Sequence, residues 1–391
     1  MQDYIKLIGL AALFVLVISC GEQGKEPEIR WKFTSAAFLS SPAIGPDNTI
    51  YAFSENDTLY AFNQDGSVKW RLGLPDTIWY HPSNILISPV VAQDNTIYLF
   101  AVDGCLYSIN SGGSINWRLP IKPTFPTIYG TPALGANGTI YVYAPESLYA
   151  ISPAGVIDWV VEVGGGSCIT FPAVGADGTI YIGADRDLIA LNPDGSVKWS
   201  FDMAPAISTI DRLAIGADRT VYVFGTGIDD AGNLLAFSDD GSLRWTCTLE
   251  DSDCISIGTP VIGIDGTVYL GSATSSARGW LYAVSPSGEV RWKKQSTSLV
   301  QEAYDLAIDS EGTIYGVEGA FTPDGNLKWR YPIGTTVVNS LGAPAIGSDG
   351  TVYIGCGTGL FAFNTSAAGL AQSSWPRSRH DNRNSGNVLT Q

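Results

Sequence analysis

Hydrophobic residues recur along this chain in short runs separated by glycine-containing turns, and segment 259–292 shows the unit most completely. An apolar run is followed by an Asp-Gly turn, two runs rich in β-branched residues and tyrosine, a Ser-Gly turn, and a last run that contains Trp292. Short runs of this composition between turn residues are typical of β-strands, and Asp-Gly favours the positive φ angles of tight hairpins. The unit therefore predicts four antiparallel strands.

The same unit recurs along most of the chain. A Leu-Tyr-Ala run marks the third strand of many units, and a tryptophan, often preceded by lysine, marks the fourth. A repeat of roughly 40 residues with four strand-like pieces indicates the blades of a β-propeller. The second strand is marked by an Ile-Tyr or Val-Tyr pair that occurs eight times, at Tyr51, Tyr98, Tyr141, Tyr181, Tyr222, Tyr269, Tyr315 and Tyr353.

The count of fourth strands predicts how the ring closes. The eighth repeat has no tryptophan-bearing strand of its own after it, while one such strand, around Trp31, precedes the first repeat. Pairing the two chain ends in one blade removes free edges. We therefore predict an all-β fold over residues 30–364, an eight-bladed propeller of four-stranded antiparallel blades closed by an N-terminal strand. Seven blades is the alternative, because residues 319–321 depart from the Leu-Tyr-Ala pattern.

The N-terminal segment is predicted to be an export signal. Residues 7–18 are apolar, which is too short a stretch to span a bilayer comfortably. The run Val-Ile-Ser-Cys that ends at Cys20 resembles the bacterial lipobox, which implies removal of residues 1–19 and attachment of lipid to Cys20. An ordinary signal peptide or a short anchor helix is the alternative. The polar residues 20–29 are predicted to be a flexible tether to the membrane.

The charge excludes one class of partner. The chain has a formal net charge of −16 and a pI of about 4.4. Such a surface repels phosphate backbones, so we expect no binding to nucleic acid.

Five cysteines remain after Cys20. Cys247 and Cys254 flank a short predicted loop, which makes them a candidate disulfide in an exported protein. The other three are odd in number, so at least one thiol is expected to be free and buried.

The sequence offers no recognisable catalytic constellation. His81 and His380 are the only histidines, and neither has the spacing of a metal site or a triad. The acidic segments 229–230 and 250–253 lack the ordered spacing of a calcium loop. We therefore predict no catalytic residues, no metal and no cofactor.

The repeats resemble the PQQ-like (pyrroloquinoline-quinone-like) repeat family. The shared phrase is Ser-Pro-Ala, then Asp-Gly-Thr-Ile-Tyr-Ile-Gly, then Leu-Tyr-Ala-Leu-Asn-Pro-Asp-Gly-Ser-Val-Lys-Trp, over about residues 30–364. Quinone-dependent dehydrogenases resemble this ring, but no two cysteines are adjacent here, as they are at the cofactor of those enzymes. The resemblance implies instead a non-enzymatic scaffold, as in the outer-membrane barrel-assembly machinery.

The expected protein is thus a monomeric lipoprotein of the bacterial envelope, at the periplasmic face of the outer membrane or the cell surface, with a protein partner. A propeller that binds carbohydrate or a small molecule in its central funnel is the alternative from another class. A quinone-dependent dehydrogenase is the third.

The tail, residues 365–391, contains the segment Trp-Pro-Arg-Ser-Arg-His-Asp, which is similar to a C-terminal segment of secreted proteins in this family. Two interpretations stay open. Either the tail packs across the ring and ties down the last blade, which we favour, or it presents a basic docking patch on an acidic protein. The patch would consist of Arg377, Arg379, His380 and Arg383.

Overall fold

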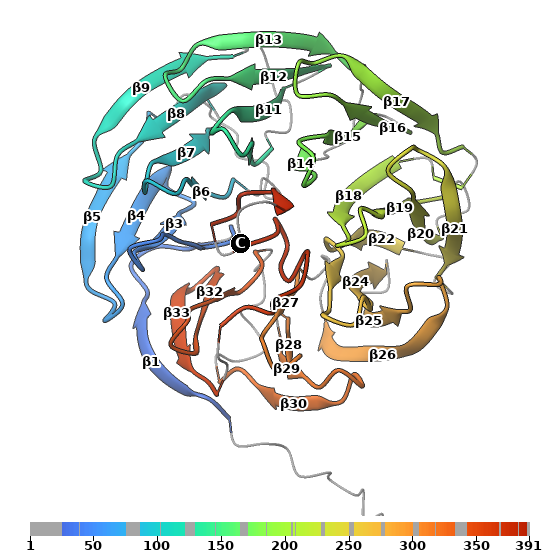
Figure 1. The fold of residues 1–391 in the computed structure, drawn as a ribbon. Helices are drawn as coiled ribbons and strands as arrows, with labels where there is room; N and C mark the ends of the chain where they lie inside the picture. The colour runs from blue at the N-terminus through green and yellow to red at the C-terminus, as the bar shows by residue number, and fades with distance from the viewer. Residues whose placement is uncertain are drawn as a thin grey trace, which may run out of the picture.

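The computed structural model shows a ring of eight β-sheets around a central axis (Figure 1). Each sheet is one blade; seven blades have four strands and one has five. Within the described ranges there is no helix of the length and hydropathy that a membrane span requires. The structure describes residues 26–38, 40–75, 87–101, 103–121, 130–144, 146–164, 171–184, 186–204, 206–207, 209–227, 231–249, 254–274, 278–299, 305–316, 318–332, 342–366, 369–381 and 383–388.

The first strand of each blade lies nearest the axis (Figure 1), and in seven blades it has only two residues. It follows a Ser-Pro, Thr-Pro or similar pair in most blades, because proline cannot donate to the sheet and is confined to strand starts and edges. In blade order the first strands are β2 (Ala43–Ile44), β6 (Val90–Val91), β10 (Ala133–Leu134), β14 (Ala173–Val174), β18 (Thr209–Ile215), β23 (Val261–Ile262), β27 (Ala307–Ile308) and β31 (Ala345–Ile346).

The second and third strands are the buried middle of each blade. Since both faces pack on neighbouring blades, their sequences are nearly continuous apolar runs. The second strands are β3 (Ile50–Phe53), β7 (Ile97–Phe100), β11 (Ile140–Ala144), β15 (Ile180–Ala184), β19 (Val221–Thr226), β24 (Val268–Thr274), β28 (Ile314–Tyr315) and β32 (Thr351–Cys356). The third strands are β4 (Thr58–Phe62), β8 (Cys105–Ile109), β12 (Ser147–Ile151), β16 (Asp187–Leu191), β20 (Gly232–Phe237), β25 (Arg278–Val284), β29 (Gly319–Phe321) and β33 (Gly359–Asn364).

The fourth strands form the outer rim and alternate between exposed and half-buried residues. The additional strand β22 (Cys254–Ile257) pairs with β24 in blade six. The fourth strands are β5 (Val68–Gly73), β9 (Ile115–Pro120), β13 (Ile157–Glu162), β17 (Val197–Asp202), β21 (Leu243–Thr248), β26 (Val290–Leu299), β30 (Leu327–Arg330) and, in blade eight, β1 (Glu28–Phe33).

The ring closes as predicted. The N-terminal strand β1 pairs antiparallel with β33, the third strand of the last repeat, so blade eight contains both ends of the propeller. Eight blades are confirmed and seven are excluded. The degenerate seventh repeat forms a blade with short middle strands, β28 and β29.

One row of residues explains why the repeat keeps alanine, tyrosine, alanine and tryptophan. In blade one, Ala43 pairs with Tyr51, Tyr51 with Ala61, and Ala61 with Trp70, so the four lie in line across the strands. The small third residue lets the two rings meet over it, with centroids 5.9 Å apart. Equivalent tyrosine–tryptophan contacts of 5.8 to 6.0 Å occur in the other seven blades.

The tryptophans also join the blades to each other. Trp159 in β13 donates its indole N–H to the carbonyl of Pro193 in the turn of the next blade, at 3.0 Å. Its ring covers Gly195 of that turn, where an added Cβ would lie 2.9 Å from the ring and where φ is +87°. Glycine is needed there for both reasons. Trp31, Trp70, Trp117, Trp199, Trp245 and Trp292 make the same joint.

Ion pairs brace the rim within five of the blades. Lys198, next to the tryptophan, donates to Asp177 in the first turn at 3.1 Å, and Asp177 also accepts from the Thr179 backbone. Burial raises the pKa of Asp177, but the hydrogen bonds from Thr179 and Lys198 outweigh this and leave the pKa lowered. Corresponding pairs are Lys69–Asp47, Arg244–Asp218, Arg291–Asp265 and Arg30–Asp349.

The predicted disulfide is absent. Cys247 faces the core from β21 as a free, buried thiol, and burial raises its pKa. The side chain of Cys254 lies outside the described residues. Cys105 and Cys356 are also free and buried, in agreement with the expectation of apolar packing for unpaired cysteines.

Candidate functional site at the ring axis

The C-terminal segment lies at the centre of the ring, where Figure 1 shows it in red. We call residues 369–381 and 383–388 the axial plug. The first strands leave their inner backbone edge open, and the plug pairs with that edge. Five plug carbonyls accept hydrogen bonds from first-strand amides: Trp375 from Ile262, Pro376 from Ile308, Arg383 from Val91, Ser385 from Leu134, and Gly386 from Val174.

Arg377 holds the plug to the junction of the last and first blades. Its side chain is completely buried. A buried guanidinium is costly unless its donors are satisfied. Here its nitrogens donate to the carbonyls of Pro42, Ala343, Pro344 and Asp381 at 2.6 to 3.0 Å, and to the side-chain oxygen of Asn384.

Other plug side chains repeat this arrangement on the first four blades. Arg379 donates to the carbonyls of Thr131, Pro132 and Pro172, at the starts of the third and fourth blades. The plug side chains therefore donate hydrogen bonds to carbonyls that point inward at the start of successive blades. Asn384 donates to Ser41 and Pro89, and Asn387 donates to Leu134.

His380 and Asp381 complete the core of the plug. His380 is fully buried, packs edge-on against Trp375 with centroids 5.2 Å apart, and lies 3.9 Å from Asp381. Asp381 accepts from Arg383 at 3.0 Å and from the hydroxyl and amide of Ser385. The hydrogen bonds of Asp381 fix the turn of the plug, whereas the ring nitrogens of His380 have no hydrogen-bond partner among the described residues.

Burial governs the protonation of the plug. It lowers the pKa of Arg377 to about 10 and that of His380 to about 4. Burial, assisted by the charge of Arg212, lowers the pKa of Arg379 to about 9. At neutral pH both arginines are therefore charged and His380 is neutral.

The backbone of the plug is tightly turned. Arg379, His380 and Asn384 have φ angles of +67°, +76° and +57°. Side chains other than glycine and asparagine rarely adopt this left-handed region, and such residues persist only where surrounding contacts fix them. The hydrogen bonds of Arg377 and Arg379 to the ring supply those contacts.

These contacts decide between the two interpretations of the tail. Arg377, Arg379, His380 and Arg383 are at most 8% exposed, whereas a docking patch needs them at the surface. The docking-patch interpretation is therefore corrected: the four side chains are interior, because they pair with carbonyls of the ring and with Asp381. The tail packs across the ring, and it contacts most of the blades rather than the last one alone.

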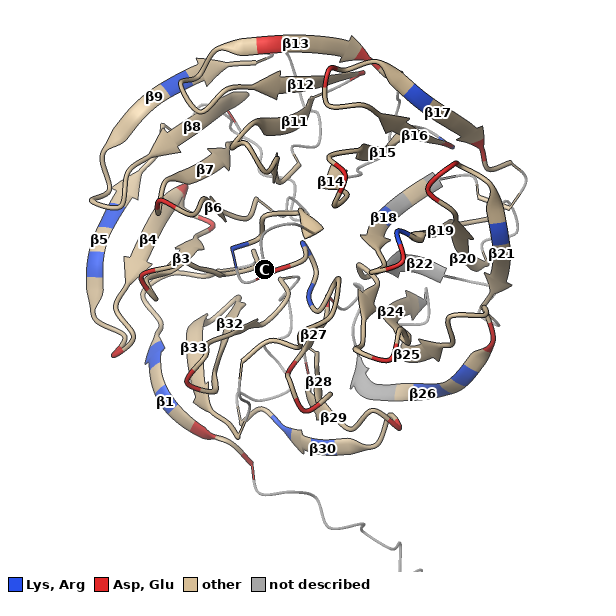
Figure 2. Cartoon of the chain, in the orientation of Figure 1, with Lys and Arg blue, Asp and Glu red and all other residues tan. Residues whose placement is uncertain are grey.

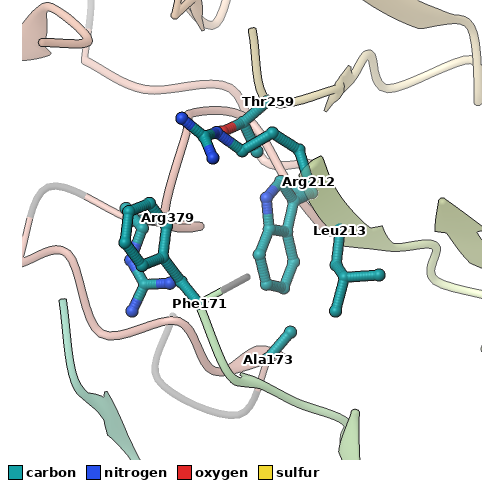
Figure 3. Close-up of a pocket in the computed structure, with 7 residues that line it drawn as sticks. Phe171, Ala173, Arg212, Leu213, Thr259 and Arg379 are labelled. Carbon is teal, nitrogen blue, oxygen red and sulfur yellow. The ribbon is translucent and has the colours of Figure 1, made fainter. Parts of the chain in front are cut away.

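A small pocket remains between the plug and the fourth, fifth and sixth blades (Figure 3). Arg212 of β18 and Arg379 of the plug both lie near the ring of Phe171, with guanidinium carbons 5.1 and 5.0 Å from its centroid. Trp375, Thr259 and other residues complete the lining. Two guanidinium groups thus contact one aromatic ring in this pocket.

The remaining candidate residues fall outside this site. Cys20, residues 1–19, His81 and the acidic segments 229–230 and 250–253 lie outside the described residues. In the ranges that the structure describes, no three His, Cys, Asp or Glu side chains gather as a metal site.

Sequence reasoning did not identify Asn384 and Asn387 as plug residues. The available signal was their position just after the Arg-His-Asp segment, in a run of polar residues without strand periodicity. The role of these asparagines follows only from the folded ring, because their acceptors are carbonyls of distant blades.

Comparison with solved structures shows that other proteins share this fold. Solved structures of similar fold include BamB from Moraxella catarrhalis, at 16% identity and a TM-score of 0.57, over 76% of this chain and 86% of that one. The C-terminal WD40 domain of Sif2 matches at 10% identity and a TM-score of 0.62, over 87% and 98%. A streptogramin B lyase matches at 10% identity and a TM-score of 0.55, over 85% and 96%. These likenesses show the fold alone, which hosts both enzymes and non-enzymes.

No sequence among the curated proteins matches this chain. A family model does match, three times and with overlap, over residues 25–126, 102–269 and 230–387. Its description is outer membrane protein assembly factor BamB. The matches span the propeller and the plug together, and the chain belongs to this family of PQQ-like repeat propellers.

Proposed function

We propose that this protein is a non-enzymatic lipoprotein of the bacterial envelope whose propeller is a docking scaffold for protein partners in outer-membrane protein assembly. The mature chain is anchored through lipid on Cys20 after removal of residues 1–19, and the following residues tether the ring to the membrane. The ring itself is a monomer.

The occupied axis is the observation that carries this proposal. Small-molecule and catalytic sites are concave, and the central channel is the natural concavity of a propeller. In this chain the channel holds the plug, in which Arg377 has five acceptors and Asp381 is bonded to Arg383 and Ser385. A rigid ring with a filled centre is suited to presenting its outer surfaces.

Family membership supports the same role, since the family description names an outer-membrane assembly factor. The lipobox-like end of the apolar segment at Cys20 supports export and anchoring. Neither argument identifies the partner.

The pocket beside the plug does not favour the alternative function, a small-molecule-binding propeller. Its volume of about 10 Å³ is room for roughly one water molecule.

An in-cell crosslink and affinity capture of the acylated protein tests the scaffold proposal, with Cys20→Ala as the control. Recovery of one envelope assembly complex, lost in the control, is the expected result. Well-crosslinked membranes that give no protein partner would overturn the scaffold.

A further inference from the structure

The fourth strands are the open edges of the blades, and one of them differs from all the others. An unpaired strand edge invites pairing with another chain, and proteins commonly block it with lysine or arginine. Figure 2 shows blue residues on the outer strands and none on β13. The sequence of β13 is Ile-Asp-Trp-Val-Val-Glu, whereas the other fourth strands carry Arg30 and Lys32, Lys69 and Arg71, Arg118, Lys198, Arg244, Arg291 with Lys293 and Lys294, and Lys328 with Arg330.

The position after the tryptophan is apolar only in β13. Val160 occupies it and is 48% exposed. Val156, just before the strand, is 60% exposed. The equivalent residues of the other blades are Lys32, Arg71, Arg118, Ser200, Thr246, Lys293 and Arg330, all polar. Nothing in the core requires an aliphatic residue at Val160, because the neighbouring Trp159 and Val161 make the contacts with the next blade.

The position before the tryptophan is inverted in charge. Five blades place lysine or arginine there and pair it with an aspartate of the first turn. Blade three has Asp158 there and Asn137 in the turn. Glu162 lies on the same exposed face of β13 as Asp158, four residues further along. Neither carboxylate has an ion-pair partner among the described residues.

We propose that this edge, residues 156–162, is a docking site for an extended segment of a partner protein that carries a basic, an apolar and a basic residue at every second position. The segment adds a fifth strand to blade three, with its basic side chains beside Asp158 and Glu162 and an apolar one on Val160. Main-chain hydrogen bonds supply affinity in such strand addition, and the alternate side chains supply specificity. The inference rests on the proposed scaffold function and names its surface.

Charge argues against a second copy of this chain as the occupant. In an antiparallel self-pairing centred on Val160, each Asp158 would face Glu162 of the other copy. Like charges directly opposite are destabilising in a sheet. A basic segment converts the same two positions into attractive pairs.

A labelled peptide with the core Lys-Thr-Val-Thr-Lys, whose lysines and valine share one face, tests the site on the purified mature chain by fluorescence anisotropy. We expect saturable binding that Asp158→Lys with Val160→Arg weakens by at least about tenfold, or about 1.4 kcal/mol. Ser200→Arg, at the equivalent exposed position of β17, is the matched control and should leave affinity unchanged. A peptide with glutamate for lysine, and one N-methylated at alternate amides, should not bind.

Equal weakening by Ser200→Arg, or equal binding of the N-methylated peptide, would show a non-specific charge effect and overturn the proposal. A wild-type dimer in sedimentation that Val160→Arg dissociates would show that a second copy occupies the edge, which also overturns it. Photo-crosslinkers placed in cells at position 160 and at position 200 separate this inference from the function beneath it. A partner captured by the whole protein but not from position 160 would refute the docking edge and leave the scaffold intact.

Discussion

The rim and the axis of this ring are held together in opposite ways. At the rim, seven tryptophans make the same half-exposed joint to the next blade, each with one indole hydrogen bond over a glycine. At the axis, one non-repeated segment makes different contacts with successive blades, and its central arginine is fully buried. Because the rim has seven equivalent joints, we expect the loss of one joint to destabilise the ring only partly. Because the axis has one plug, we expect the loss of its central arginine to cost more stability.

The junction of blades seven and eight shows why the axis matters. Blade eight takes its fourth strand from the N-terminus, so no hairpin turn follows β33 to receive Trp329. Instead Trp329 packs edge-on against Tyr331 at 5.1 Å, and Tyr331 packs on Phe363 at 4.8 Å. The plug spans this seam: Pro376 accepts a hydrogen bond from Ile308 of blade seven, and the next residue, Arg377, donates to Ala343 and Pro344 of blade eight. The plug reinforces the ring where the repeated joint is missing.

The largest loss of stability is expected from Arg377→Met, at the axis. The change removes five hydrogen bonds and leaves carbonyls of blades one and eight without their donor. Breaking a buried charged network of this kind typically costs about 3–5 kcal/mol. We expect the urea unfolding midpoint to fall accordingly. Arg186→Met, which removes an exposed pair with Asp202, is the control and should change little. Equal effects would mean that the plug is not an anchor.

The pH dependence of stability isolates the axis from the rim. The pKa of His380 is about 4 in the folded protein and ordinarily near 6.5, so between these values only the unfolded chain takes up the proton. Stability is therefore complete above pH 6.5 and falls as the pH drops towards 4, by up to about 1.4 kcal/mol per pH unit. His380→Phe should remove this slope in urea titrations at pH 7.0, 5.5 and 4.5. A slope that persists in the variant would assign it to other groups.

A smaller effect is expected at a single rim joint. Gly195→Ala places a Cβ 2.9 Å from the ring of Trp159 in a backbone with φ of +87°, and we expect a loss of roughly 1–3 kcal/mol. Gly164→Ala is matched in backbone, with φ of +76°, but an added Cβ there meets nothing within 4 Å. The difference between the two unfolding free energies therefore measures the tryptophan contact. If both variants lose the same unfolding free energy, the loss in Gly195→Ala comes from backbone strain and not from the tryptophan contact.

The smallest effect belongs to the ion pairs of the rim. Lys198→Met removes the pair with Asp177, in which both side chains are about one-third exposed. We expect about 0.2–1 kcal/mol, because solvent screens such pairs. The loss should shrink further in 1 M salt. A salt-independent loss above that range would point to packing of the lysine stem.

The rim was predictable from sequence because it is repeated. Tyr51, Ala61 and Trp70 recur in equivalent positions, so the strand order and the closing role of Trp31 follow from counting. Repetition also limits what can be predicted. The sequence allowed a disulfide between Cys247 and Cys254 by spacing alone, but the alternation of β21 turns Cys247 into the core.

The axis was predictable only as a pair of alternatives. Arginine and histidine in a polar tail are ordinarily surface residues, and nothing within the tail indicates burial. Their environment comes from carbonyls as distant in sequence as Pro42 and Pro344, which converge only after the ring has closed. The edge of β13 was detectable in principle by aligning the fourth strands, but Asp158 and Val160 gain meaning only once those strands are known to be open edges.

The position of Arg377 has a consequence for the order of events during synthesis. Its acceptors lie 335 residues away in the first blade and 33 residues away in the last. The guanidinium can be desolvated without penalty only when both sets of carbonyls face the axis together. The tail can therefore insert only after the first and the last blade have both folded into the ring. A molecule with one misregistered blade would keep this segment in solvent, where it is open to proteases, and only finished rings would withdraw it from them.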